Sequence, residues 1–231
     1  MPDFTCRSTQ DELMDNFSLG SEVIDPIMDE LEVINKRLGG HRVFYDAFKQ
    51  IGLHSGMSIS DWGCGGGDSL REIARWARDK QLKLSFNGID ATASAVDYAR
   101  KHSASYPEIS FTLADVLSDR IGPEQFDVVI SSLFTHHFKE ADWIRLVRKM
   151  YSCATRAVII NDLHRHWFAY HAIGVLTRLL SRSELVKHDS KVSVLRGFRR
   201  QELVLMLEKA GITKYSIQWK WAFRWQVILY K

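Results

Sequence analysis

The stretch Ile59-Ser60-Asp61-Trp62-Gly63-Cys64-Gly65-Gly66-Gly67-Asp68 decides the fold of this chain. It predicts a short strand, then a glycine turn, then the start of a helix. Gly63, Gly65 and Gly67 stand at alternate positions, and a residue without Cβ allows positive φ and the close approach of a ligand. The helix that follows offers free backbone N–H groups at its N-terminus. The stretch therefore indicates a loop that binds a nucleotide-like cofactor.

Two acidic side chains at this turn narrow the choice of cofactor. A dinucleotide fingerprint needs glycine at the sixth position counted from Gly63, where this chain has Asp68, and a phosphate-binding P-loop needs a lysine that the loop lacks. Asp61 and Asp68 would repel a pyrophosphate but suit a positively charged ligand. S-adenosyl-L-methionine (SAM) carries a sulfonium and an ammonium group and no phosphate. The loop therefore favours SAM over NAD(P), and an NAD(P)-dependent oxidoreductase is the disfavoured alternative.

Three further strands follow in a fixed order. The sequences FNGID at Phe86–Asp90 and FTLAD at Phe111–Asp115 each end in an acid, and FDVVI at Phe126–Ile130 is a fourth strand. Together with the first motif, an acid followed by G-x-G-x-G, this order resembles the class I SAM-dependent methyltransferases. Over roughly residues 42 to 231 the chain is similar to the ubiquinone/menaquinone-biosynthesis type of small-molecule methyltransferases.

This resemblance implies a set of cofactor-binding residues. Asp90 stands where the family holds the ribose hydroxyls, and Asp115 stands where it contacts the adenine amine. The implied cofactor site consists of Asp61, Gly63, Gly65, Gly67, Asp90, Ala91, Asp115, Val116 and Ser131.

The order of strands and helices predicts the fold class. Strand and helix patterns alternate between residues 42 and 161, which is typical of a doubly wound, mostly parallel α/β sheet. Ligands of such sheets bind beyond the carboxyl ends of the strands. The resemblance implies seven strands in the order 3-2-1-4-5-7-6, with the last strand antiparallel. A chain of 231 residues is expected to form one domain, so we interpret residues 1–231 as a single methyltransferase domain.

Two segments lie outside this alternation. Residues 1–40 carry apolar residues at helical spacing, with Asp25-Pro26 as the expected helix start and Gly39-Gly40 as its end. We interpret them as a helical cap over the site; the alternative is a helix packed on the sheet edge. Residues 163–198 begin with an apolar helix expected over Leu163–Leu180 and continue into a basic region. We interpret them as an inserted helical lid over an apolar pocket. The alternatives are a helix buried between sheet and cap, and an amphipathic helix on a membrane surface.

Aromatic residues alternate near the end of the chain. Trp219, Trp221, Phe223 and Trp225 would share one face if the backbone were extended throughout. We expect them to form core, or a wall under the lid, rather than a platform for stacked bases.

The composition excludes several classes of protein. A hydrophobic content of 45% with 26% charged residues is ordinary for a globular protein, and a net charge of +3 does not by itself indicate nucleic-acid binding. Cys6, Cys64 and Cys153 form no C-x-x-C pair, which fits a reducing compartment. The sequence has no secretory signal and no run of about 18 apolar residues. We therefore expect a cytoplasmic protein with no transmembrane segment and no nucleic-acid partner, although peripheral membrane contact stays open.

Four histidines stand in the two loops expected to border the methyl donor. His136 and His137 follow the fourth strand, and His164 and His166 follow the fifth. Methyl transfer to a hydroxyl needs alignment and removal of a proton, for which histidine is the usual base near neutral pH. We favour His137, with His166 second, and expect His136 to turn into the start of the next helix. His164 and His166 could ligate a metal in an H-x-H pair, but we expect no metal.

The loop after the fourth strand also narrows the acceptor. Methyltransferases that act on amino groups of nucleobases or glutamine usually carry Asn/Asp-Pro-Pro-Tyr/Phe there, whereas this chain has the sequence SLFT at Ser132–Thr135. We therefore predict SAM-dependent methylation of a hydrophobic small molecule, with O-methylation of a phenol or enol favoured. The alternatives are C-methylation in quinone-like or polyketide biosynthesis, an RNA or protein methyltransferase, and a non-catalytic SAM-binding subunit.

Overall fold

The computed structural model describes residues 2–15, 20–117 and 121–231. Residues 16–19 of the predicted cap, among them Phe17 and Leu19, lie outside the described residues. The sheet consists of strands β1 Ser58–Trp62, β2 Ser85–Asp90, β3 Ile109–Leu113, β4 Phe126–Ser132, β5 Ala154–Leu163, β6 Tyr215–Lys220 and β7 Arg224–Tyr230. The helices are η1 Leu13–Asp15, α1 Ser21–Arg37, α2 Arg42–Ile51, α3 Asp68–Asp79, α4 Ala93–His102, η2 Thr135–His137, α5 Glu140–Cys153, α6 Trp167–Leu180, α7 Glu184–Arg196 and α8 Arg200–Lys209.

The seven strands form one sheet in the order β3-β2-β1-β4-β5-β7-β6. β1 pairs in parallel with β2 and β4, while β7 runs antiparallel to both β5 and β6. The central strands are nearly continuous apolar runs because helices cover both of their faces; Ala157–Ile160 in β5 are completely buried. This architecture confirms the predicted fold class and strand order.

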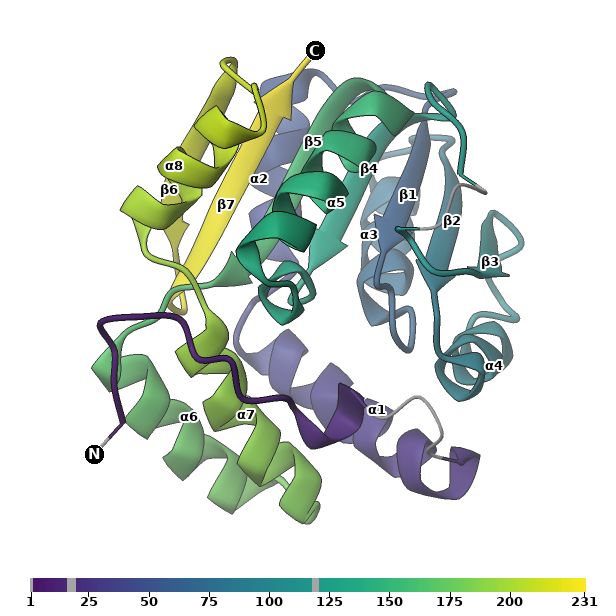
Figure 1. Cartoon of the computed structure of the whole chain (residues 1–231). Coiled ribbons are helices and arrows are strands. Elements are labelled where there is room, and N and C mark those ends of the chain that lie inside the picture. Colours follow the sequence, from purple (N-terminus) through teal and green to yellow (C-terminus); the bar gives the residue numbers. More distant parts are fainter. Residues whose placement is uncertain (1, 16–19, 118–120) are drawn as a thin grey trace.

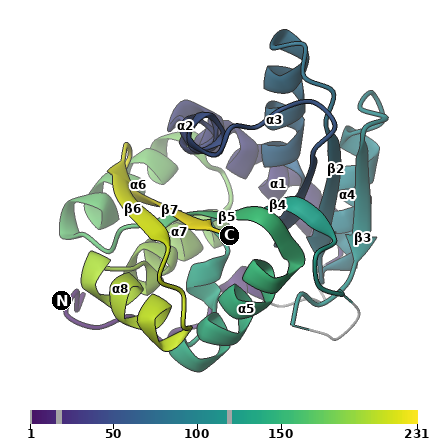
Figure 2. The same cartoon turned by 90° about the horizontal axis from the view of Figure 1, so that it is seen from above.

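Helices cover the two faces of the sheet in separate layers (Figures 1 and 2). On one face, α2 and α3 bury Phe44, Phe48, Leu70 and Ile73 against β1, β4 and β5. On the other face, α5 and α8 contribute a second apolar cluster of Trp143, Leu146, Val147, Met150, Leu203, Met206 and Leu207. The sheet is thus held rigidly from both sides, which fixes the positions of the loops at its edges.

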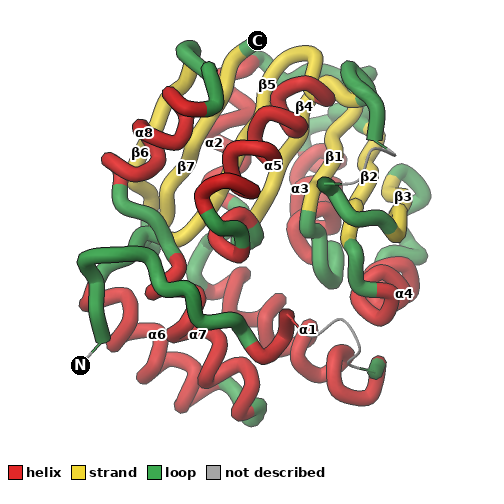
Figure 3. Tube along the Cα trace, in the orientation of Figure 1, coloured by secondary structure: helices red, strands yellow, loops and turns green. Residues whose placement is uncertain are grey.

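A third layer, made of α1, α6 and α7, lies beyond one edge of the sheet (Figures 1 and 3). In Figure 1 the antiparallel strand β7 points away from this layer, so the parallel strands end facing it. Ile27 and Ile34 of α1 pack with Val186 of α7, and apolar side chains of α6 adjoin this cluster. The predicted cap and lid segments therefore lie together at the carboxyl ends of the parallel strands. Their function as a cap and a lid stays a prediction.

The boundaries of these helices differ from the prediction. α1 begins at Ser21 after the N-cap Gly20, so Pro26 lies inside the helix and not at its start. The earlier start places Ile24 on the same buried face as Ile27, with both side chains 2% exposed. In the lid, Leu163 belongs to β5 and the helix begins only at Trp167.

The lid segment is anchored where it leaves and rejoins the fold. His164 and Phe198 form an isolated bridge, with the Phe198 N–H donating to the Leu163 carbonyl at 2.8 Å and the Arg165 N–H donating to the Phe198 carbonyl at 3.0 Å. Hydrogen bonds at the base of the insertion limit its movement to α6 and α7.

The four alternating aromatics do not lie along one extended strand. A turn over residues 221–223 interrupts the extended chain between β6 and β7, and Trp219 instead pairs across the hairpin with Trp225. Trp225 is buried, as expected of core, but Trp219 and Trp221 are exposed. The prediction that all four form core or a wall under the lid was therefore wrong for these two tryptophans.

Among the described residues, no helix is long and apolar enough to cross a membrane.

Candidate active site

The three glycines of the first motif have positive φ angles of 71°, 49° and 74° at Gly63, Gly65 and Gly67. A Cβ at Gly63 would lie 2.1 Å from the ring of Phe134, and a Cβ at Gly67 would lie 2.8 Å from the ring of Phe111. A Cβ at Gly65 would meet only the Met28 sulfur, at 3.9 Å. Two of the glycines therefore make room for aromatic rings, whereas Gly65 faces open space where a ligand can approach.

Asp90 organises the loop from the end of β2. One carboxylate oxygen accepts the Gly65 N–H and the other accepts the Thr92 N–H, both at 2.9 Å. A carboxylate has about four acceptor positions, so two positions are left for the ribose hydroxyls that the resemblance implies.

The remaining predicted cofactor residues differ in their surroundings. Ala91 and Asp115 are exposed, and the Asp115 carboxylate accepts the Leu117 N–H at 2.8 Å. Val116 is buried in the core. The Ser131 hydroxyl is completely buried and donates to the Trp62 carbonyl at 2.9 Å, so it links β4 to β1. The cofactor-binding roles of these residues stay predictions.

The two acids of the first motif are not equivalent. Burial raises the pKa of Asp68, but a hydrogen bond from His41 at 3.2 Å and contacts with Arg71 and Asn35 outweigh it, and its pKa lies below the ordinary value. Asp61 is 1% exposed, and its Oδ1 has no hydrogen-bond partner among the described residues. Burial first, and then the charges of Asp68 and Asp90, raise its pKa well above the ordinary value.

A buried carboxyl group next to two others stays protonated unless a cation balances its charge. The unpartnered Asp61 oxygen, the open space at Gly65 and the free acceptor positions of Asp90 together fit a cationic nucleoside such as SAM. In that arrangement Asp61 would face the positive charge of the cofactor, and Asp90 would accept from its ribose hydroxyls. None of these groups fits a pyrophosphate.

Asp162, at the end of β5, fixes the loop that follows β4. Its carboxylate accepts the Thr135 hydroxyl at 2.7 Å, the His136 N–H at 3.0 Å and the His136 Nδ1 at 2.7 Å. Burial lowers the pKa of His136, but Asp162 and Glu12 outweigh it and raise the pKa to about 9. The pKa of Asp162 falls to about 2 because His136 and Thr135 outweigh the effect of burial. His136 is therefore a buried cation inside η2.

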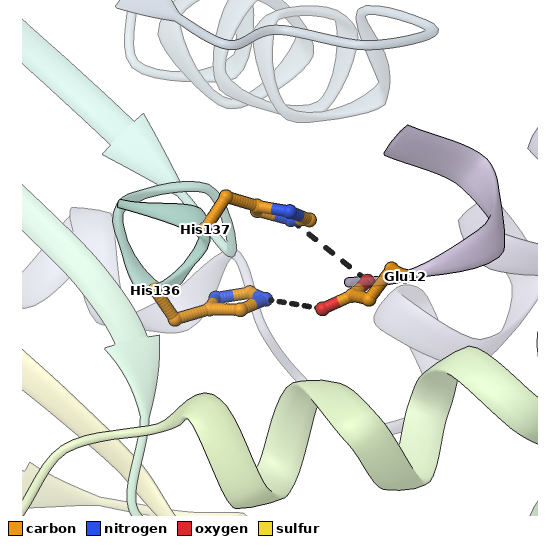
Figure 4. A group of neighbouring side chains, drawn as sticks. All are labelled: Glu12, His136 and His137. Atoms are coloured by element: carbon orange, nitrogen blue, oxygen red, sulfur yellow. Dashed lines mark ion pairs between the residues drawn. The ribbon is translucent and has the colours of Figure 1, made fainter. Parts of the chain in front are cut away.

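His137 also points towards Glu12, with its ring centroid 4.4 Å from that of His136 (Figure 4). Its Nε2 lies 3.9 Å from one Glu12 oxygen, and the His136 Nε2 lies 3.4 Å from the other. The Glu12 side chain is 7% exposed and that of His137 is 25% exposed. Burial raises the pKa of Glu12, but His136 and His137 outweigh it and hold the pKa below its ordinary value. The arrangement therefore presents a partly exposed imidazole beside a carboxylate that can stabilise its protonated form.

His137 lies close to the glycine loop through one aromatic side chain. The Phe134 ring packs on Gly63 and its centroid lies 6.2 Å from that of His137. His136 and His137 also line a cavity of about 350 Å³, together with the N-terminal segment 5–11 and part of α8. This volume lies within the range of small-molecule sites.

The same three side chains could also ligate a metal. Ligand atoms of Glu12, His136 and His137 lie within 4.8 Å of one another, and two histidines with one carboxylate are a familiar zinc donor set. His136 already carries a proton between Asp162 and Glu12, and a metal would have to displace it. The absence of a metal stays a prediction.

His164 and His166 belong to a different part of the molecule. They lie with Trp167, Trp225 and Phe4 around a cavity of about 600 Å³, and their ring centroids are 5.5 Å apart. Burial first, and then His166, lowers the pKa of His164 to about 4. The four predicted histidines thus form two separate pairs, and their catalytic roles stay predictions.

Several residues of this site were missed or read differently at the sequence level. Glu12 has no local signal, because it reaches His136 and His137 only through the folding of the N-terminal segment. The Arg165 guanidinium is completely buried and paired with Glu202, with Nη2 to Oε1 at 2.5 Å. Phe134 could not be assigned to Gly63 from spacing alone.

Comparisons with known proteins agree with this geometry. Residues 59–156 match a family model described as a methyltransferase domain, and no curated protein sequence matches the chain. A candidate SAM-dependent methyltransferase of Methanococcus maripaludis is 16% identical, with 96% of this chain and 97% of that one covered and a TM-score of 0.65. A SAM-dependent methyltransferase from Aquifex aeolicus is 16% identical, with 80% of this chain and 87% of that one covered and a TM-score of 0.60.

A third solved structure is the magnesium protoporphyrin IX methyltransferase of Synechocystis with bound S-adenosylhomocysteine. It is 17% identical, with 85% of each chain covered and a TM-score of 0.55. At such identities the likeness establishes the fold. The matched domain and the shared fold agree with the predicted class of enzyme, a SAM-dependent methyltransferase, and with SAM as its cofactor.

The glycine loop gives a test that separates ligand contact from packing. Gly65→Ala should weaken SAM binding at least about tenfold, because the added Cβ projects into the open space, at a stability cost of about 1–2 kcal/mol for the left-handed backbone. Gly67→Ala should cost more stability, because its Cβ would also collide with Phe111. Calorimetry with SAM and thermal unfolding of both variants would measure the two effects. Equal SAM affinity in wild type and Gly65→Ala would contradict this assignment.

The His136 cation predicts a pH-dependent stability. A pKa raised from 6.5 to about 9 contributes stability that is fully present below pH 6.5 and lost as the pH rises through about 9. With about 1.4 kcal/mol for each pKa unit, the loss should reach at most about 3 kcal/mol. Denaturant unfolding between these pH values would measure it, with His136→Asn as the variant that should lose the dependence. A dependence of the same size in that variant would refute the assignment.

Proposed function

We propose that this methyltransferase acts on the oxygen of a lipophilic small molecule, a phenol or an enol, with His137 as the general base. The observation that carries the proposal is the His137–Glu12 pair at the end of β4, one aromatic ring away from the glycine loop. SAM supplies an already activated methyl group, so the protein's own task is to orient the acceptor and remove its proton.

The side chains around His137 suit this task. A partly exposed imidazole can reach an acceptor in the adjoining cavity, and the Glu12 carboxylate stabilises the imidazolium that forms when His137 takes the proton. His136 cannot serve as the base while it holds its own proton between Asp162 and Glu12. We assign His136 the role of positioning η2 and Glu12, and His137 the role of contacting the acceptor.

The lipophilic character of the acceptor is inferred from apolar groups near the base. Phe134 and Phe138 pack edge to face at 5.0 Å between their ring centroids, and Phe138, Leu205 and Met206 line the same cavity as His137. Charged side chains, among them Arg7 and Glu140, line the rest of that cavity. C-methylation of a related acceptor is the second candidate. A carbon nucleophile that must lose a proton could use the same general base.

The general base gives a prediction with a characteristic pH dependence. His137→Ala should lower turnover at least about a hundredfold near neutral pH, while SAM affinity stays within about threefold because the cofactor contacts lie elsewhere. The loss should shrink as the pH rises towards the acceptor's own pKa of about 10, where hydroxide ionises a phenol unaided. Turnover of a phenol panel, followed by mass gain of one methyl group, would measure both effects.

The exposed His54, in the loop before β1, offers a matched control. His54→Ala should leave turnover unchanged at every pH. An equal loss in His137→Ala at all pH values would show that His137 positions the acceptor. No loss at all would transfer the base to His166 or indicate an acceptor that needs no base.

A further inference from the structure

The outer face of α6 is apolar and uncovered in this chain. Its exposed residues recur at helical spacing and form one face, which consists of Trp167, Phe168, His171, Ala172, Val175, Arg178 and Leu179. Trp167 is 58% exposed and Leu179 is 78% exposed. The opposite face, with Ala169, Gly174 and Thr177, is the buried one. A surface helix of a globular domain normally has the reverse pattern.

Aromatic rings extend this face onto the β6–β7 hairpin. The centroid of Phe168 lies 5.7 Å from that of Phe223, and Phe223 lies 5.7 Å from Trp219. Trp221, in the turn of the same hairpin, is 69% exposed. We call α6 together with residues 219–223 the docking surface. Tryptophan and phenylalanine in such exposed positions are typical of side chains that enter the interface of a lipid bilayer.

Exposed arginines flank the docking surface. The sequence from residue 163 to residue 183 contains no Asp or Glu. Arg178 and Arg182 are exposed towards the end of α6 and just beyond it, and Arg199 and Arg200 are exposed beside the cavity that Trp167 lines. Three acidic residues also lie close by: Lys220 pairs with Asp46 at 3.2 Å, the backbone N–H of Arg182 donates to Glu30 at 2.9 Å, and the charges of Lys187 first, and then Arg178, lower the pKa of Glu184. The exposed arginines around this apolar face complement an anionic surface.

We propose that the docking surface binds the interface of an anionic lipid bilayer. At 14 residues α6 is too short to span a membrane, so it would lie in the plane of the interface with Trp167, Phe168, Val175 and Leu179 inserted. The surface lies on the lid segment at the carboxyl ends of the strands, where a lipophilic acceptor could pass from the bilayer to the enzyme. Docking is measured without SAM or acceptor, so it can fail independently of the function proposed above.

The test compares a double substitution on α6 with a single valine substitution on α1, a helix of the same layer. Val175 of α6 is 60% exposed and Val33 of α1 is 47% exposed. Wild type should sediment with phosphatidylcholine vesicles that contain phosphatidylglycerol, and at least about tenfold less with pure phosphatidylcholine vesicles. V175S combined with L179S should lose most of the binding to the anionic vesicles, whereas V33S should keep it. Circular dichroism would establish that each variant is folded.

Other outcomes overturn the proposal. Equal binding by the double variant and the wild type would exclude the docking surface, and equal binding to both vesicle types would exclude the anionic lipid. The alternative occupant of the docking surface is a second copy of the chain, and light scattering without lipid tests it. A wild-type dimer that is dissociated by V175S combined with L179S would assign the surface to that second copy. Absence of wild-type binding to any vesicle would also refute the membrane-docking proposal.

Discussion

The Asp162 carboxylate is the group on which the rest of the site depends. It lies at the end of β5, 1% exposed, and accepts hydrogen bonds from Thr135, His136 and its own neighbour Leu163. A buried carboxylate is costly unless its acceptor positions are filled and its charge is balanced. The Thr135 and His136 donors satisfy the acceptors, and the His136 imidazolium supplies the charge. Because the Thr135 and His136 donors belong to η2, the cost of burying Asp162 also determines where η2 must lie.

The position of η2 determines where its neighbouring side chains lie. With η2 held by Asp162, the residue before it, Phe134, is placed on Gly63, and the residue at its end, His137, is turned towards Glu12. Arg7 and Arg196 strengthen the same arrangement from outside, because their guanidinium groups donate to the backbone carbonyls of His136, His137 and Phe138. The two arginines come from the N-terminal segment and from α7. Segments outside the sheet thus take part in shaping the loop after β4.

The sheet could be predicted from the sequence because its signals are local. Runs such as Ala157–Ile160 and the acid-ended motifs at Asp90 and Asp115 occur within a few residues, and the strand order came from the family resemblance that these motifs carry. The glycine loop could also be predicted from the sequence. Spacing alone could not distinguish Gly65, where an added Cβ would meet only Met28, from Gly63 and Gly67, which make room for aromatic rings. Helix ends were less predictable, since burial of Ile24 extends α1 past Pro26, a residue that favours a start.

The histidines were the hardest to place, for a physical reason. Sequence spacing put all four in loops at the same edge of the sheet, but direction within a loop depends on partners that are remote in sequence. Asp162 draws His136 into the protein, Glu12 faces His137, and the aromatic rings of Trp225 and Phe223 hold His164 and His166 on the side of the second cavity.

The charge balance of the molecule connects these separate observations. The site holds three carboxyl groups at the first two motifs, of which Asp68 is hydrogen-bonded to His41, whereas one oxygen of Asp61 has no hydrogen-bond partner among the described residues. A cofactor with positive charge completes this set, and it brings its reactive methyl group to an edge of the sheet where Glu12 and Asp162 are already balanced by histidines. Excess positive charge lies instead at the exposed arginines around α6. An anionic surface would therefore attract the lid side of the enzyme and leave the cation-binding loop free for its cofactor, because the two charge patterns occupy different parts of the fold.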